Sequence, residues 1–211
     1  MSYGKASYTE SVFLNCPFDD EYLKLFQALI FSVYYCGFIP RSAKEENTAT
    51  ENRLRKIYTM IEDSRYGIHD LSRVELDSDN KLPRFNMPFE LGLFLGCNQY
   101  SEGRKQKLKQ CMVMDSKPHR FKISLSDLGG VDGYGHADDP EQIIKVVRNW
   151  LQTASKKTLI PSALIIKNQY SIFLNELPSI CEESQFDLDD LSYNEYLTIV
   201  EEWIDEYSDV A

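Results

Sequence analysis

The sequence predicts an α/β fold, a three-layer sandwich in which helices cover both faces of a central parallel sheet of four or five strands. Two observations lead to this prediction. Short apolar runs alternate along the chain with longer segments of helical periodicity, and this alternation is typical of parallel strands joined by helices. The apolar runs are also continuous rather than alternating, as expected for strands that are buried on both faces.

The first strand is expected at residues 11–15 (SVFLN), a run of apolar and β-branched side chains. Asp19 or Asp20 should cap the helix that follows over residues 22–35, where apolar residues recur three and four positions apart. Gly37 ends this helix, because glycine is the usual residue just beyond a helix C-terminus.

Two further strands and one helix are expected in the next part of the chain. Residues 38–40 form a brief second strand, and residues 50–64 repeat the helical spacing. Residues 66–71 (YGIHDL) form the third strand, and the polar residues 72–83 form a loop. His69 lies within the third strand, so we expect a histidine of the core or the sheet face rather than a metal ligand.

The helix expected at residues 86–97 is apolar nearly all round, which predicts that it is buried. Pro88 fits only its first turn, because proline cannot donate the hydrogen bond that a helix interior requires. Gly92 and Gly96 lie four residues apart on one face, so we expect this face to pack very close to the sheet.

The fourth strand is expected at residues 111–114 (CMVM), and residues 123–135 are expected to form a loop. The last helix of the α/β domain runs from Pro140 through Leu151. Asp139 should cap it, since a capping residue followed by proline is a common start of a helix.

The distribution of charge divides the chain into two parts. The net charge is −10, yet residues 168–211 hold twelve acidic residues and no Lys, Arg or His, whereas residues 1–167 hold 21 acidic and 23 basic residues. We expect an α/β domain over residues 1–155 and an acidic helical segment over residues 156–211. The acidic side chains of this segment form either a solvated helix surface or a docking surface for a partner. The apolar stripe of the segment, which includes Trp203, should pack on the core or on a second subunit.

Several classes of protein are disfavoured. No apolar run reaches the roughly 20 residues of a membrane helix, and the polar N-terminus lacks the apolar stretch of a secretory signal. The five cysteines include no CxxC pair, which favours a cytoplasmic chain without a metal site, and Cys16 is expected to be a packed thiol. Direct binding to duplex nucleic acid is not expected, because no basic stripe is present. A phosphorylated small ligand suits the nearly neutral α/β domain.

Glu90 is the residue that most suggests chemistry. Ligands of open parallel sheets bind beyond the carboxyl ends of the strands, and Glu90 follows Pro88 near the start of a helix whose dipole favours an ionised carboxylate. Burial of a carboxylate among apolar side chains costs free energy unless a partner compensates its charge, so an unpaired buried carboxylate suggests a functional role. The alternative is a glutamate at the rim that only stabilises the helix dipole. Other polar residues expected at the strand ends lie at 15–20, beginning with Asn15, and further along the chain at Arg41, Asp70, Ser72, Arg73 and Asp115.

Four segments together resemble a bacterial group of nucleoside 2-deoxyribosyltransferase-like proteins, which are distant relatives of the Toll/interleukin-1 receptor (TIR) domains. The segments are VFLNCPF at 12–18, YGIHDLSR at 66–73, RFNMPFELGLFLG at 84–96, and DPE with VRNWL at 139–151. The resemblance covers residues 11–151 and implies a flavodoxin-like fold. It is strongest at Glu90, Leu91 and Gly92, whereas the Trp-Cys pair that precedes the catalytic glutamate of TIR enzymes is missing here.

The resemblance implies roles for individual residues. In both families the helix glutamate acts at C1′ of a ribose, so Glu90 would stabilise or capture the ribosyl cation, and Asp70 would donate a hydrogen bond or a proton to the leaving base. The side chains expected around the substrate are Phe18 for stacking, Arg41, Arg73 and Arg84 for a phosphate, Asn86 for a ribose hydroxyl, and Ser72. No cofactor is expected, since NAD or a related nucleotide would be the substrate.

The expected function is therefore cleavage of an N-glycosidic bond, or (deoxy)ribosyl transfer, on NAD or a nucleoside. The resemblance also implies a role in bacterial antiphage defence, as a homo-oligomer or as a subunit of a defence complex. The alternative is a non-catalytic nucleotide-sensing or scaffold module that acts through assembly. Glu90 distinguishes the two, because an enzyme requires it and a scaffold does not.

Overall fold

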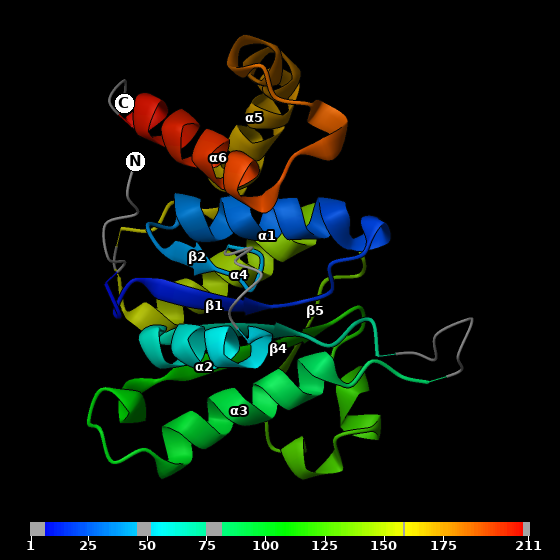
Figure 1. Cartoon of the computed structure of the whole chain (residues 1–211), viewed down its shortest axis with the longest axis vertical. Coiled ribbons are helices and arrows are strands. Elements are labelled where there is room, and N and C mark those ends of the chain that lie inside the picture. The colour runs from blue at the N-terminus through cyan, green and yellow to red at the C-terminus, as the bar shows by residue number, and fades with distance from the viewer. Residues whose placement is uncertain (1–6, 46–51, 75–81, 158, 209–211) are drawn as a thin grey trace.

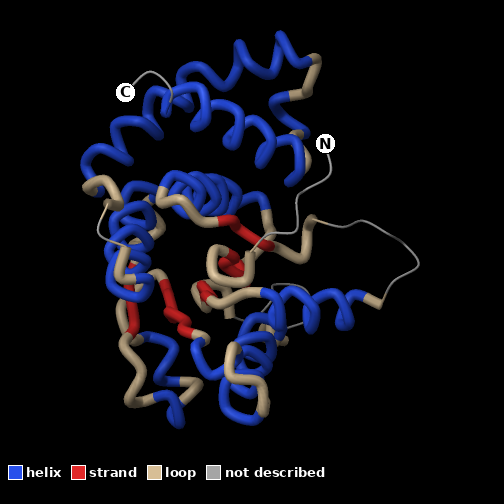
Figure 2. The backbone as a smooth tube through the Cα atoms, turned by 90° about the vertical axis from the view of Figure 1, so that its left-hand side faces the viewer, coloured by secondary structure: helices blue, strands red, loops and turns tan. Residues whose placement is uncertain are grey.

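The computed structural model describes residues 7–45, 52–74, 82–157 and 159–208. Its centre is a sheet of five parallel strands in the order β2-β1-β3-β4-β5. The strands are β1 (Ser11–Asn15), β2 (Ile39–Arg41), β3 (Tyr66–Asp70), β4 (Gln110–Asp115) and β5 (Gly133–Gly135). Figure 2 shows them enclosed between helices. The predicted α/β fold with a flavodoxin-like strand order is confirmed.

Helices cover both faces of the sheet, and a further pair lies outside them (Figure 1). The helices are α1 (Leu23–Tyr35), α2 (Arg53–Asp63), α3 (Asn86–Tyr100), α4 (Pro140–Ser155), α5 (Ala163–Ser184) and α6 (Tyr193–Ser208). α1 and α4 lie on one face of the sheet, α2 and α3 lie on the other, and α5 and α6 lie beyond α1 (Figure 1). Asp19 caps the short 3₁₀ turn Asp20–Tyr22 that leads into α1, and Asp139 caps α4 as expected.

The acidic C-terminal segment packs on the core. The ring of Phe31 in α1 lies 5.0 Å from that of Tyr170 and 5.2 Å from that of Phe173, both in α5, and 5.9 Å from that of Trp203 in α6. Tyr193 in α6 donates a hydrogen bond to the carbonyl of Pro40 in β2. α1 is therefore covered by the sheet on one side and by α5 and α6 on the other, which explains its almost wholly apolar sequence.

One strand is present where a loop was expected. β5 is the segment Gly-Tyr-Gly, which offers no apolar run for a sequence pattern to detect. Its glycines are required by close contacts, because a Cβ on Gly135 would lie 2.4 Å from the ring of Pro118. The expectation of a loop over residues 123–135 is therefore wrong at its C-terminal end.

The packing of α3 also differs from expectation. Its buried residues are Met87, Glu90, Leu91 and Phe94, whereas a Cβ on Gly92 would meet no atom within 4 Å. The close approach comes instead from the sheet, where a Cβ on Gly67 in β3 would lie 2.9 Å from the ring of Phe94. The glycine face does not contact the sheet, so the sequence pattern predicted the helix but not its orientation.

Some expected elements extend beyond the described part of the chain. Residues 50 and 51 of the expected second helix and residues 75–81 of the expected loop at 72–83 lie outside it. Among the helices that the structure describes, none combines the length and apolar character needed to cross a bilayer.

Candidate active site

The order of the strands places a candidate site at the carboxyl ends of β1 and β3. The chain passes from β1 to β2 on one side of β1 and then crosses to β3 on the other side, so the helical connections diverge between β1 and β3. In sheets of this kind the crevice that binds ligands is expected at this point. Asn15 and Asp70 are the last residues of these two strands. The first turn of α3 is bonded to the same edge through Met87, and Glu90 lies in the next turn.

Asn15 and His69 hold the start of α3 against the strands. The Nδ2 atom of Asn15 donates to the carbonyl of Met87 at 2.8 Å and lies 2.9 Å from Nδ1 of His69. His69 is fully buried, and burial lowers its pKa to about 3, so the ring is neutral. His69 is thus a core histidine, as expected. Asn15 lies at the strand end where polar residues were expected, but the sequence did not predict its bonds to His69 and Met87.

Glu90 is buried and has no bonded partner. Its exposure is 8%, and within the described residues no side chain or backbone group donates a hydrogen bond to its carboxylate or forms an ion pair with it. Burial raises its pKa to about 7, and the charge of Arg53 opposes this rise only in part. A carboxylate with a strongly raised pKa at the edge where ligands bind is a candidate functional group.

Asp70 is buried more deeply than Glu90 and is fully bonded. Its Oδ2 atom accepts a 2.5 Å hydrogen bond from the hydroxyl of Tyr22 and lies 3.2 Å from Nε2 of His136, and its Oδ1 atom accepts the backbone N–H of Ser72. Burial alone would raise the pKa of Asp70, but the interactions with His136, Tyr22 and Ser72 outweigh burial and lower it. Asp70 is therefore ionised and enclosed, and it is a poor proton donor in this conformation.

Tyr22 and His136 were not identified as partners of Asp70 from the sequence. Both are fully buried. His136 directly follows β5, so it occupies the same strand-end position as Asp70 and Asp115, and predicting that strand would have found it. Burial alone would lower the pKa of His136, but Asp70 outweighs burial and raises it.

A second ion pair, between a buried carboxylate and a partly exposed arginine, lies at the end of β4. Asp115 accepts a 2.7 Å bond from Nε of Arg120, whose Nη2 atom donates to the carbonyl of Ser72 at 2.6 Å. Oδ2 of Asp115 and Oγ of Ser72 are buried and have no hydrogen-bond partner among the described residues. These two atoms are therefore left to bond a water or a ligand.

The arginines expected to meet a phosphate are already paired in this structure. Arg84 lies 2.8 Å from Asp19, Arg73 lies 3.6 Å from Glu21, and Nε of Arg41 bonds both carboxylate oxygens of Glu45. Because Arg73 and Arg84 flank the segment between β3 and α3, their acidic partners connect the two sides of the crevice.

The remaining expected residues lie at the margin of the crevice. Phe18 is half-buried against Phe26, with the ammonium of Lys44 5.0 Å from its ring centre. Asn86 is exposed at the start of α3. Cys16 is buried, and burial together with the charges of Asp70 and Glu90 raises the pKa of its thiol well above the usual value, so it is not an activated nucleophile.

Within the described part of the chain, no group of three or more His, Cys, Asp or Glu side chains is placed to hold a metal ion. Comparisons with protein-family profiles, with curated proteins and with solved structures found no match to this chain. The function of this protein is therefore inferred from the residues at the carboxyl ends of β1 and β3.

Proposed function

We propose that this protein breaks the N-glycosidic bond of NAD or a related nucleotide or nucleoside, either by hydrolysis or by transfer of the (deoxy)ribosyl group. The observation that carries the proposal is Glu90, a buried carboxylate without a partner among the described residues, beside the strand ends of β1 and β3. A buried charge is costly when nothing pairs with it, and a cationic reaction centre is the partner that would compensate this cost.

The chemistry of glycosidic cleavage requires such a group. Positive charge develops on C1′ and the ring oxygen as the bond breaks, and a fixed carboxylate on one face can stabilise that charge or bond to C1′. With a pKa of about 7, Glu90 is partly ionised at neutral pH, and a cationic ligand beside it would favour the ionised form. Activity should therefore rise with pH through neutrality.

The state of Asp70 favours NAD over a deoxynucleoside. A neutral base needs a proton as it departs, and Asp70 is ionised, fully buried and bonded at both oxygens. Nicotinamide departs from a cationic nitrogen and needs no proton. We therefore propose that Asp70 orders the edge of the sheet rather than acting as the acid, and that NAD is the preferred substrate.

Recognition of the rest of NAD is proposed for the residues around the crevice. Arg73 and Arg84 would exchange Glu21 and Asp19 for the diphosphate, since a phosphate accepts the same guanidinium donors as a carboxylate. Phe18 would stack on a ring, Asn86 would bond a ribose hydroxyl, and the unpartnered Oγ of Ser72 would bond a polar atom of the ligand.

The proposal is tested by incubating the purified protein separately with NAD and with deoxynucleosides and separating the products by chromatography. Release of nicotinamide from NAD is expected, and an added free base distinguishes transfer from hydrolysis, because transfer yields a new nucleoside. If neither NAD nor any deoxynucleoside loses its base, the proposed chemistry is wrong.

The second candidate is a non-catalytic nucleotide-sensing or scaffold module. It is favoured by Phe85 and Phe89, which are 68% and 51% exposed beside Glu90 and could bind another protein. A scaffold predicts that substitution of Glu90 leaves function intact, whereas substitution of the two phenylalanines abolishes assembly.

A further inference from the structure

The connection between α4 and α5 presents apolar side chains to solvent at the amino end of the sheet, opposite the candidate active site. Leu159 is 93% exposed, and Leu164 and Ile165 in the first turn of α5 are 68% and 48% exposed. Isolated exposed apolar residues are common, but three within seven positions form a patch of the kind that binds another surface.

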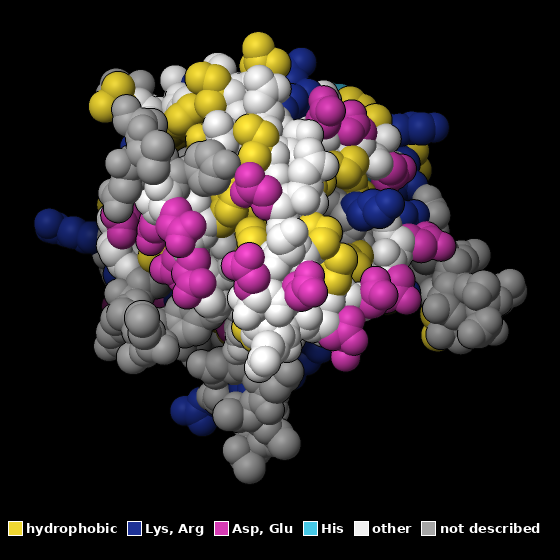
Figure 3. Space-filling view, turned by 90° about the horizontal axis from the view of Figure 1, so that it is seen from above, with side chains coloured by type: hydrophobic (Ala, Val, Ile, Leu, Met, Phe, Trp, Pro, Cys, Tyr) yellow, Lys and Arg dark blue, Asp and Glu magenta, His cyan; other side chains and the backbone are white. Residues whose placement is uncertain are grey.

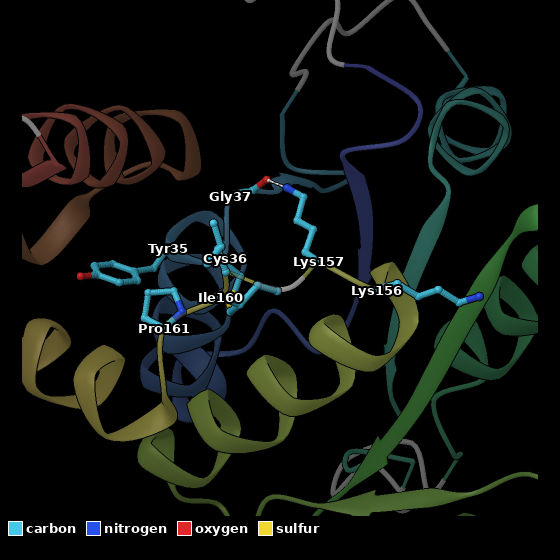
Figure 4. A pocket seen from close by; sticks show the side chains of 8 residues that line it. Tyr35, Cys36, Gly37, Lys156, Lys157, Ile160 and Pro161 are labelled. Atoms are coloured by element: carbon cyan, nitrogen blue, oxygen red, sulfur yellow. Dashed lines mark hydrogen bonds between the residues drawn. The ribbon is translucent and has the colours of Figure 1, made fainter.

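A cavity of about 460 Å³ adjoins this patch. It is lined by the end of α1 and by the connection itself, with Tyr35, Gly37, Lys157, Leu159, Ile160 and Pro161 among its residues. Figure 4 shows Lys157 reaching across to Gly37, with Ile160 beside Cys36 and with Tyr35 and Pro161 on the far side of Cys36. The cavity is therefore mainly apolar on one side and basic on the other.

Hydrogen bonds fix the walls of this cavity. Nε and Nη2 of Arg148 donate to the carbonyls of Pro161 and Ile160 at 2.7 and 2.8 Å. Nζ of Lys157 donates to the carbonyl of Gly37 at 2.8 Å and lies 4.2 Å from the ring centre of Phe38. A surface that is ordered before binding loses little conformational entropy when a partner arrives. Lys157 also retains two further N–H donors, since an ammonium group has three.

The other end of α5 carries a complementary feature. Leu188 is 42% exposed in the 3₁₀ turn Leu188–Asp190, and the exposed carboxylates of Asp187, Asp189 and Asp190 surround it in the sequence. α5 has 22 residues, so it separates this turn from the cavity by about 33 Å. Seen from above, acidic side chains spread across the face of α5 and α6, and Lys and Arg lie at its margin (Figure 3).

We propose that these two ends of α5 bind one another between copies of this chain, so that the protein assembles head to tail. Leu188 of one copy would enter the cavity of the next, and its neighbouring carboxylates would meet Lys157. The charge of the chain favours a second copy in this orientation. Residues 168–211 carry twelve acidic and no basic groups, so two such surfaces repel, whereas the end of α5 with the cavity is basic.

A head-to-tail contact joins two different surfaces, so it leaves one free surface of each kind on every dimer. The assembly therefore grows beyond a dimer, either into a closed ring or into an open filament, and it forms without any requirement for the activity proposed above. This asymmetry gives a test with two variants, each of which cannot assemble alone but can pair with the other.

The test measures molar mass by light scattering for the whole chain and for two variants, Leu159→Ser and Leu188→Ser. The unsubstituted chain should grow beyond a dimer as its concentration rises about a hundredfold. Each variant alone should stay near the monomer mass of 24.5 kDa, because each lacks one of the two surfaces. An equal mixture should form dimers and nothing larger. Each variant retains the surface that the other lacks, and the resulting dimer has no intact surface left to bind a third copy.

Ile123→Ser is the matched control, because Ile123 is 88% exposed on a distant 3₁₀ turn and its loss should leave assembly unchanged. Added salt should weaken the assembly, because the contact includes exposed charges. The proposal is overturned if the unsubstituted chain stays monomeric throughout, or if it assembles while the mixture of variants does not.

Discussion

Asp70, at the end of β3, and Glu90, in the second turn of α3, are both buried carboxylates at the same edge of the sheet. Their pKa values shift in opposite directions. Asp70 is more deeply buried, yet His136, Tyr22 and Ser72 outweigh the effect of burial and lower its pKa. Glu90 has only the charge of Arg53 to oppose burial, and its pKa rises to about 7.

The difference shows that burial depth alone does not decide the state of a carboxylate. Donors that surround Asp70 make it a structural anion, whose negative charge the fold requires. Glu90 is held in place by its helix, and no residue in the described part of the chain bonds its side chain, so the fold would be more stable without its charge. Groups that destabilise a fold in this way are common at functional sites. The following predictions test this contrast.

The largest effect on stability is expected for Asp70→Asn. Removing one member of a buried ion pair leaves the other charge uncompensated and typically costs about 3–5 kcal/mol. His136 would then lose the interaction that raises its pKa. Denaturant unfolding at neutral pH gives the free energy directly. A loss of less than about 1 kcal/mol would mean that the pair around Asp70 contributes little.

Glu90→Gln should increase the stability of the fold, unlike Asp70→Asn, and the size of this increase should depend on pH. The unfolded chain ionises Glu90 near 4.5, whereas the folded chain retains the proton up to about pH 7, so folding takes up a proton between these values. Stability of the unsubstituted protein therefore falls as pH rises through this window, by roughly 3 kcal/mol in total. The variant should gain about this amount above pH 7 and almost nothing below pH 4.5. A difference that does not change with pH would contradict the raised pKa.

Tyr22→Phe should reduce the stability of the fold by less than Asp70→Asn does. It removes one hydrogen bond to a charged group, which is worth about 1.5–3 kcal/mol, and leaves the ring packed in the core. Tyr58→Phe is a suitable control, because Tyr58 is 47% exposed on α2 and its variant should unfold like the unsubstituted protein. Equal melting temperatures for all three proteins would show that the hydroxyl of Tyr22 does not stabilise Asp70.

The smallest effect is expected for Arg84→Ala. The side chain of Arg84 is 47% exposed, so its ion pair with Asp19 should contribute at most about 1 kcal/mol to stability. If Arg84 binds the diphosphate, KM for NAD should increase while kcat changes little. An unchanged KM would remove Arg84 from the proposed binding site.

Local sequence patterns were sufficient for much of the fold. The apolar run of β1 and the capping of α4 by Asp139 were predicted correctly, because each depends on residues that are neighbours in the chain. Pro88 likewise placed Glu90 in the first turns of α3. β5 was missed, because Gly-Tyr-Gly becomes a strand only by pairing with β4.

The contacts around the buried carboxylates could not be predicted from the sequence. The hydroxyl of Tyr22 reaches Asp70 across 48 positions of the chain, and His136 does so from the strand that was missed. No local pattern reports such contacts. The pairing of Arg73 and Arg84 with Glu21 and Asp19 was hidden for the same reason.

The most direct test of the account is to measure base release from NAD and the melting temperature on the same preparation of Glu90→Gln. Glu102→Gln, at an exposed position just beyond α3, is the matched control. The account predicts that Glu90→Gln loses about 10²–10³-fold in turnover, or more if Glu90 bonds to C1′, while its melting temperature rises at neutral pH or above. Full turnover with a lowered melting temperature would contradict it and would assign Glu90 to the helix dipole alone.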